Sequence, residues 1–431
     1  MRILRASSLR GGRQGRLARV RATETRAPGR ARGVALPALA APWRAALLAA
    51  VLLAALAAGG APARADQPGA EPMRALWVVR STMTRPDRIE RMIQRARQYG
   101  VEDLFVQVRG RADAFYRPGL EPRAEAIEDT TFDPLEYVLR RAHQEGLRVH
   151  AWMNVFLVWS ANQNPRDPSH LANAHPNWSA VRPDGRALWS LTRDEFEGTI
   201  TEGMFSAAGN PEVREEFLEV VRDVLRRYPV DGIHLDYVRY PSSAVGYDYG
   251  SRTEFMRATG VDPAWMADRP EYLRARFGSD GVGDLARRWA AWQTGTVDEV
   301  VRGVRAAVDS LRPQAQVSAA VIADLNAALG RNRQNWPAWL KAGWLDFVVP
   351  MVYSPSDRTF EGQLRVILEQ AAGRPVVAGV GVYDQPARSA ARKIALARRL
   401  GAAGIALFSY DAIMDQPSYW QALRAAYMGL R

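Results

Sequence analysis

The sequence contains no cysteine among its 431 residues. This absence excludes a disulfide framework, a thiol nucleophile, an iron–sulfur cluster and a lipid-modified cysteine. Histidine is scarce, with five in the chain, and neither H-E-x-x-H nor H-x-H occurs. No G-x-S-x-G follows an apolar run, and no G-x-G-x-x-G follows the first one. These absences disfavour zinc, serine-hydrolase and dinucleotide chemistry, so we expect neither a metal nor another cofactor.

The formal net charge of +12 is unevenly distributed along the chain. Residues 1–65 hold twelve arginines and one acidic residue, Glu24, so the rest of the chain is nearly neutral. A nearly neutral body lacks the basic surface that binding to nucleic-acid phosphates requires. We therefore expect no nucleic-acid partner, and nothing in the sequence identifies a protein partner.

Residues 1–65 have the features of a secretory signal peptide. Arginines precede the apolar run Ala45–Ala58, and small residues lead to Ala63-Arg64-Ala65. The run is short for a transmembrane helix, although an uncleaved anchor is the alternative interpretation. We expect cleavage after Ala65, a periplasmic or secreted protein without stable membrane insertion, a linker at 66–72 and a single domain over 73–431.

Short apolar runs alternate with amphipathic helical stretches from Met73 onward. The expected strands are 75–79, 104–108, 149–154, 232–236, 317–322, 347–352, 376–380 and 405–408. The expected helices are 87–99, 133–144, 211–228, 287–311, 336–342, 360–370, 387–400 and 419–428. Buried strands separated by helices indicate a parallel sheet, because parallel neighbours need crossover connections. Eight such units predict an α/β fold, a closed (β/α)8 TIM barrel.

Two connections are too long for simple loops, residues 155–209 after the third strand and 237–283 after the fourth. Both follow the carboxyl ends of strands, where the active sites of TIM barrels lie. Both insertions are rich in aromatic residues, which can stack on the C–H face of a sugar. The alternative is that these rings form small cores beneath the loops.

Asp236 is the strongest catalytic candidate because it ends the fourth strand and shares a face with His234. A structural salt bridge to Arg239 or Arg109 is the alternative role. Glycoside hydrolysis usually needs two carboxyl groups. Asp324 after the fifth strand and Asp113 after the second are the candidates for the second one, and the sequence does not choose between them.

Several strings in residues 73–428 resemble the glycosyl hydrolase-like 10 family of exported bacterial proteins. They are Arg74-Ala75-Leu76-Trp77-Val78, Val106-Gln107-Val108-Arg109, Val149-His150-Ala151-Trp152-Met153-Asn154, Asn210-Pro211-Glu212-Val213-Arg214, Asp231-Gly232-Ile233-His234-Leu235-Asp236-Tyr237-Val238-Arg239-Tyr240-Pro241 and Asp346-Phe347-Val348-Val349-Pro350-Met351-Val352-Tyr353. The resemblance implies a TIM barrel with its cleft at the strand carboxyl ends and Asp236 as the principal acid there. Some relatives have paired aspartates where this chain has Asp236-Tyr237, so one candidate for the second carboxylate is missing.

The family includes a divisome-localised glycosyl hydrolase that acts on peptidoglycan strands stripped of peptides. The resemblance therefore implies an exported glycosidase whose substrate is a cell-envelope polysaccharide, above all peptidoglycan glycan strands lacking stem peptides. Asp236 would act as nucleophile or general base, and Asp324 or Asp113 as proton donor. The residues expected to bind the sugar are Gln107, Arg109, Trp152, Asn154, His234, Tyr237, Arg239 and Tyr353. The alternatives are a glycan-binding barrel without turnover, and a polysaccharide deacetylase or lyase.

Overall fold

The computed structural model describes residues 72–161, 163–191, 195 and 202–428, all within one compact unit of the chain. The predicted signal peptide over 1–65 lies outside the described residues. None of the described helices is both long and apolar enough to cross a membrane.

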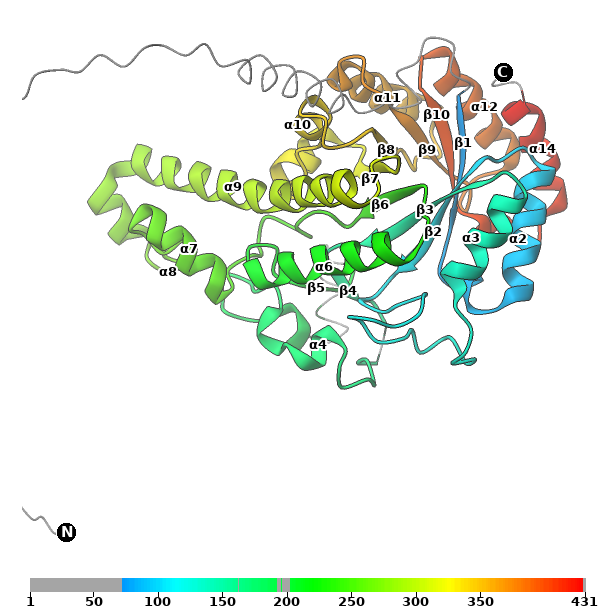
Figure 1. The fold of residues 1–431 in the computed structure, drawn as a ribbon. Coiled ribbons are helices and arrows are strands. Elements are labelled where there is room, and N and C mark those ends of the chain that lie inside the picture. The colour runs from blue at the N-terminus through cyan, green and yellow to red at the C-terminus, as the bar shows by residue number, and fades with distance from the viewer. Residues whose placement is uncertain (1–71, 162, 192–194, 196–201, 429–431) are drawn as a thin grey trace, which may run out of the picture. The chain divides into compact units, whose positions relative to one another are not determined.

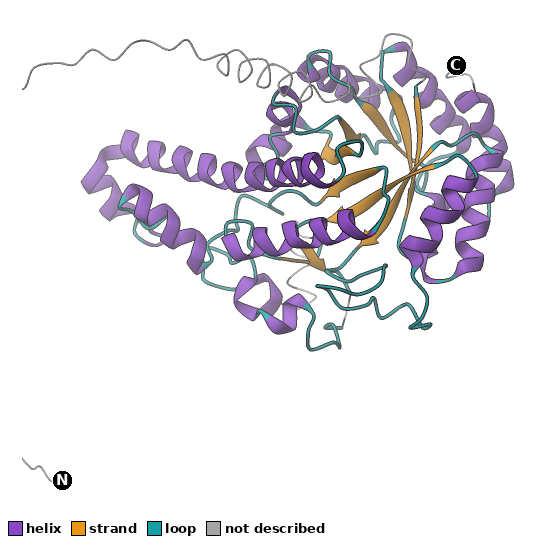
Figure 2. Ribbon diagram, viewed as in Figure 1, coloured by secondary structure: helices purple, strands orange, loops and turns teal. Residues whose placement is uncertain are grey.

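Eight parallel strands close into a barrel in the order β1-β10-β9-β8-β7-β6-β3-β2, which confirms the predicted TIM barrel (Figures 1 and 2). The strands are β1 (Met73–Val78), β2 (Asp103–Arg109), β3 (Arg148–Asn154), β6 (Gly232–Asp236), β7 (Gln316–Ile322), β8 (Phe347–Met351), β9 (Val377–Gly381) and β10 (Gly404–Phe408). Each expected strand agrees with its observed bounds to within two residues, because strands buried on both faces are continuous apolar runs.

Helices surround the barrel and cover its outer face (Figure 2). They are α2 (Pro86–Gln98), α3 (Pro134–Gln144), α6 (Pro211–Arg227), α9 (Pro270–Leu311), α10 (Trp336–Lys341), α11 (Asp357–Ala371), α12 (Ala387–Arg399) and α14 (Pro417–Met428), with the short α13 (Tyr410–Ile413) after β10. Two of them begin in the same way, because the side chains of Asp133 and Asn210 accept hydrogen bonds from the first turns of α3 and α6. Proline at the first helical position completes both starts.

The insertion after β3 contains a two-stranded antiparallel sheet, β4 (Leu157–Trp159) and β5 (Met204–Phe205), and the short helix α4 (Leu171–Ala174). Residues 192–194 and 196–201 of this insertion lie outside the described residues. The described part of the insertion places some of its side chains at the carboxyl end of the barrel.

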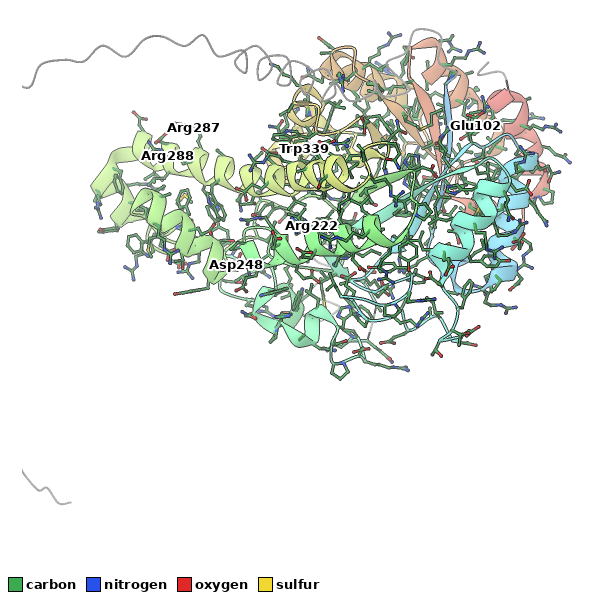
Figure 3. All side chains as sticks on the ribbon, viewed as in Figure 1. Glu102, Arg222, Asp248, Arg287, Arg288 and Trp339 are labelled. Atoms are coloured by element: carbon green, nitrogen blue, oxygen red, sulfur yellow. The ribbon has the colours of Figure 1, made fainter. Side chains whose placement is uncertain are left out.

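The insertion after β6 is mainly helical rather than an open loop. Helices α7 (Tyr249–Thr259) and α8 (Trp265–Asp268) lie beside the first part of α9, and together they form an arm that projects from the barrel (Figure 1). Asp248 caps α7 at the base of the arm, and Arg287 and Arg288 lie along α9 (Figure 3). The expected helix 287–311 is too short at its amino end, because α9 begins at Pro270, inside the segment 237–283 that was expected to be a long connection. The structure has a single kink there, with φ of 69° at Gly278, and helix on both sides.

Candidate active site

A cavity of about 370 Å³ lies at the carboxyl ends of the barrel strands. Its walls come from seven barrel strands (β1, β2, β3, β6, β7, β8 and β10), the loops that follow them and the insertion after β3. The residues that line it are Trp77, Val79, Arg80, Gln107, Trp152, Asn154, Leu157, Ser160, Glu202, Asp236, Tyr237, Arg239, Ala320, Met351, Tyr353 and Phe408. Six of the eight side chains predicted to bind sugar are among them. The cavity therefore combines aromatic rings with polar groups around one carboxyl group, Asp236.

Asp236 is the last residue of β6 and is 6% exposed. The next residue, Tyr237, has a left-handed φ of 50°, and its backbone N–H donates to Asp236 Oδ1 over 2.7 Å. Burial raises the pKa of Asp236 to about 6, although Arg239 and the Tyr237 N–H favour the charged form. This carboxyl group therefore retains a proton at a higher pH than an ordinary aspartate does.

A second carboxylate in the cavity belongs to Glu202, which the sequence did not single out. Arg239 connects it to Asp236: Nη2 lies 2.9 Å from Glu202 Oε2, and Nη1 lies 3.8 Å from Asp236 Oδ1. The side chain of Glu202 is 56% exposed, whereas Asp236 is buried. The two carboxyl groups thus share one guanidinium but have different environments.

Three buried polar atoms among the residues that line the cavity make no hydrogen bond of normal geometry. They are Trp152 Nε1, Asn154 Oδ1 and Arg239 Nη1. The Trp152 indole N–H is directed at the Asp236 carboxyl group, and this weak hydrogen bond slightly lowers the pKa of Asp236. Because these three atoms lie at a cavity, a bound ligand can supply the hydrogen bonds that the protein does not.

Two tyrosines complete the polar lining. Burial and the nearby Asp236 charge raise the pKa values of both Tyr237 and Tyr353 above the usual range. Tyr353 is stacked on Phe408, with ring centroids 5.2 Å apart. Both hydroxyls consequently remain neutral and can donate hydrogen bonds to a bound sugar.

His234 lies one layer below the cavity and does not line it. Its Nε2 accepts a hydrogen bond from Trp77 Nε1 over 3.0 Å, and its Nδ1 lies 2.9 Å from Ser318 Oγ. Because Nε2 is an acceptor, Nδ1 carries the proton and donates to Ser318. Burial lowers the pKa of His234, so the ring is neutral. His234 therefore lies beneath Trp77 and orients the indole ring through this hydrogen bond.

Arg109 also lies outside the cavity, and a change of strand register explains why. The register between β2 and β3 shifts between Gln107 and Arg109, so the alternation that would place both on one face is interrupted. Arg109 forms a buried ion pair with Glu121, Nη2 to Oε1 at 2.6 Å, and lies over the Phe217 ring of α6. Gln107 remains in the cavity, where its Oε1 accepts from Arg80 Nη1 over 3.0 Å.

The structure does not bring Asp324 or Asp113 into the cavity with Asp236. Asp324 is exposed, and its Oδ1 accepts a hydrogen bond from the backbone N–H of Ala327 over 2.8 Å. Asp113 lines a neighbouring cavity, where its Oδ1 accepts from the backbone N–H of Arg111 over 2.8 Å. Both therefore have local roles in shaping turns. In the described part of the chain, no group of three or more His, Asp or Glu side chains is placed to hold a metal ion.

The family model for the glycosyl hydrolase-like 10 proteins matches residues 72–398. The chain belongs to this family. Two curated members of similar sequence are glycosyl hydrolase DigH of Escherichia coli, 24% identical over 70% of this chain and 70% of its own length, and glycosyl hydrolase YngK of Bacillus subtilis, 19% identical over 61% of this chain and 48% of its own length.

Solved structures of glycosidases have the same barrel fold as this chain. The glycoside hydrolase domain of PgaB from Bordetella bronchiseptica superposes with a TM-score of 0.61 at 17% identity, over 83% of this chain and 99% of that domain. A β-galactosidase from Rahnella sp. R3 gives 0.58 at 14% identity, over 86% of this chain and 58% of that enzyme. At these identities the likeness extends to the fold alone.

Proposed function

We propose that this protein is an exported glycoside hydrolase that cleaves peptidoglycan glycan strands lacking stem peptides. The observation that carries the proposal is the pairing of Asp236 and Glu202 through Arg239 in a cavity lined by aromatic rings. Glycosidic cleavage requires two carboxyl groups on one cleft, and here one is buried and the other is exposed to water. The signal-peptide features of residues 1–65 support export.

Asp236 acts as the proton donor in this proposal, which reverses the role expected from the sequence. Its pKa of about 6 leaves roughly a tenth of the Asp236 carboxyl groups protonated at pH 7, far more than for an ordinary aspartate. It protonates the glycosidic oxygen as the bond to the anomeric carbon breaks. Trp152 and Tyr353 hold the sugar against the carboxyl group.

Glu202 acts as the charged partner of Asp236. It either takes a proton from the attacking water or bonds to the anomeric carbon itself, and these routes give inverted and retained products, respectively. Arg239 holds Glu202 toward the cavity through their ion pair. Proton NMR of the first product formed identifies which anomer is released.

The test is to incubate the purified protein with peptidoglycan glycan strands, with and without stem peptides, and to read the products by mass spectrometry. Asp236→Asn is the inactive control, and Asp324→Asn is a matched control because Asp324 is exposed and outside the cavity. We expect shorter sugars from the wild type and from Asp324→Asn, and none from Asp236→Asn.

Three outcomes contradict the proposal in different ways. Binding without cleavage by the wild type would make the protein a glycan-binding barrel. Loss of acetyl groups without chain shortening would indicate a deacetylase, and an unsaturated product that absorbs in the near ultraviolet would indicate a lyase.

A further inference from the structure

A second cavity, of about 210 Å³, lies beside the first at the carboxyl end of β2. Arg80 lines both cavities, and Ser160 of the first cavity accepts a hydrogen bond from Arg111 of the second, Nε to Oγ at 3.0 Å. A chain that occupies the first cavity can therefore continue past Arg80 into the second. The second cavity differs from the first in its charge, because four arginines line it.

Two of these four arginines are engaged with other groups. Arg123 donates to the backbone oxygens of Phe132 and Thr130, and Arg166 lies 3.9 Å from the carboxylate of Glu125. Among the described residues, no carboxylate lies within ion-pair distance of the guanidinium groups of the other two, Arg80 and Arg111. Arg80 donates to Gln107 and Arg111 to Ser160, so each guanidinium keeps further N–H donors for a ligand.

The two guanidinium groups are held in place by their surroundings. Arg111 lies over the Trp159 ring, 5.3 Å from its centroid, and its backbone oxygen accepts from His170 Nε2 over 2.6 Å. Gly110 leaves room for Arg80, because a Cβ at that position would lie 2.6 Å from Arg80 Cδ. Long side chains restrained in this way lose less conformational entropy when they bind a ligand.

The electrostatics of the pair favour an anion. Burial lowers the pKa of Arg111, and the nearby charge of Arg80 lowers it further. Asp113 and Glu125, which line the same cavity, act in the opposite direction. Two like charges that are partly removed from water repel each other, and a bound anion relieves that repulsion.

We propose that Arg80 and Arg111 form a subsite for a carboxylate carried by the sugar next to the cleavage point. This inference rests on the proposed function and narrows its substrate to an acidic glycan. In a peptidoglycan strand without stem peptides, the lactyl group of each N-acetylmuramic acid ends in a free carboxylate. An attached peptide converts that carboxylate into an amide, which has no charge and occupies more space. The arginine pair therefore supplies a physical reason for selecting strands without peptides.

The test measures binding in an Asp236→Asn background, so that the result does not depend on cleavage. Four tetrasaccharide probes are compared by calorimetry: a glycan with free lactyl carboxylates, the same glycan with the carboxylates converted to methylamides, chitotetraose, and a tetramer of galacturonate. Arg80→Gln and Arg111→Gln remove the charges. Arg140→Gln, an exposed arginine on α3, makes the same change elsewhere.

Each cavity variant should weaken binding of the free-carboxylate glycan by about tenfold or more, because a charge-assisted hydrogen bond is lost. The methylamide glycan and chitotetraose should change by less than about twofold, and Arg140→Gln should change nothing. Arg111→Lys should restore part of the affinity, since it keeps the charge but not the planar fork. Thermal unfolding of each variant identifies any that fail to fold.

Equal weakening of all the probes by Arg80→Gln and Arg111→Gln, or weakening of none, would overturn the subsite. If the arginines strengthen the binding of galacturonate and of no other probe, the pair is a carboxylate subsite, but peptidoglycan is not the glycan that carries the carboxylate. Arginine-dependent binding of the free-carboxylate glycan by a wild type that cleaves nothing would support the subsite and overturn the hydrolase proposal.

Discussion

Two layers of the barrel interior, which lie two residues apart on β6, differ in how completely their polar groups are hydrogen-bonded. In the lower layer, His234 is fully buried and both ring nitrogens have partners, Trp77 and Ser318. In the upper layer, Asp236 accepts one backbone hydrogen bond, and the N–H of neighbouring Trp152 makes no hydrogen bond of normal geometry. A polar group whose bonds are all made within the protein contributes to the fold, whereas one left incomplete at a cavity is available to a ligand.

Removing the Asp236 carboxyl group should have the largest effect. We expect Asp236→Asn to lower kcat by about a thousandfold, because the proton donor is lost. At pH 7 the variant should be more stable than the wild type by about 2 kcal/mol, since an ionised buried carboxyl group opposes folding. Product assays and urea unfolding measure the two effects. Full activity in a folded variant would remove Asp236 from the site.

Replacing Glu202 should have the next largest effect. Glu202→Gln keeps the size of the side chain and removes its charge, so we expect kcat to fall by about a hundredfold. Asp324→Asn is the matched comparison, because it removes an exposed carboxylate that lies outside the cavity. Equal rates for Glu202→Gln and the wild type would require another partner for Asp236.

The pH dependence distinguishes a proton donor from a base. The folded pKa of Asp236, about 6, exceeds its ordinary value of 3.8, so the carboxyl group is protonated below pH 6 and ionised above it. If the protonated form is the active one, kcat/KM falls about tenfold per pH unit once the pH is well above 6. A profile that instead rises through pH 6 would assign Asp236 as base or nucleophile, the role expected from the sequence.

A matched pair of tryptophan variants compares the two layers, and we expect the effects of these variants to be the smallest. Trp77→Phe leaves the buried His234 Nε2 without its donor, and Trp152→Phe removes an N–H that makes no hydrogen bond of normal geometry. Both variants lose similar volume, so Trp77→Phe should be less stable than Trp152→Phe by about 1 kcal/mol. Trp152→Phe should instead raise KM several-fold. Urea unfolding and steady-state kinetics give both values, and equal stabilities would contradict the contrast between the layers.

The site residues show where the alternation of side chains along a strand correctly predicts which of them face the barrel interior and where it does not. Trp152 and Asn154, both expected to bind sugar, share one face of β3 and line the cavity, because β3 pairs with β6 without a shift in register. The alternation was wrong for the direction of Arg109, because the register shift after Gln107 turns that side chain to Glu121 and α6. No local pattern distinguishes a strand that contains a bulge from one that does not.

The sequence by itself determined the eight strands and their order, because each strand buried on both faces is a short apolar run between helical periods. It also determined the place of Asp236 at the end of β6. Only the tertiary structure decided which carboxylate joins Asp236, because Glu202 comes from an insertion that folds back over the barrel and meets Arg239 across 37 residues of chain. Such long-range contacts depend on loop geometry, which leaves no periodic signal in the sequence.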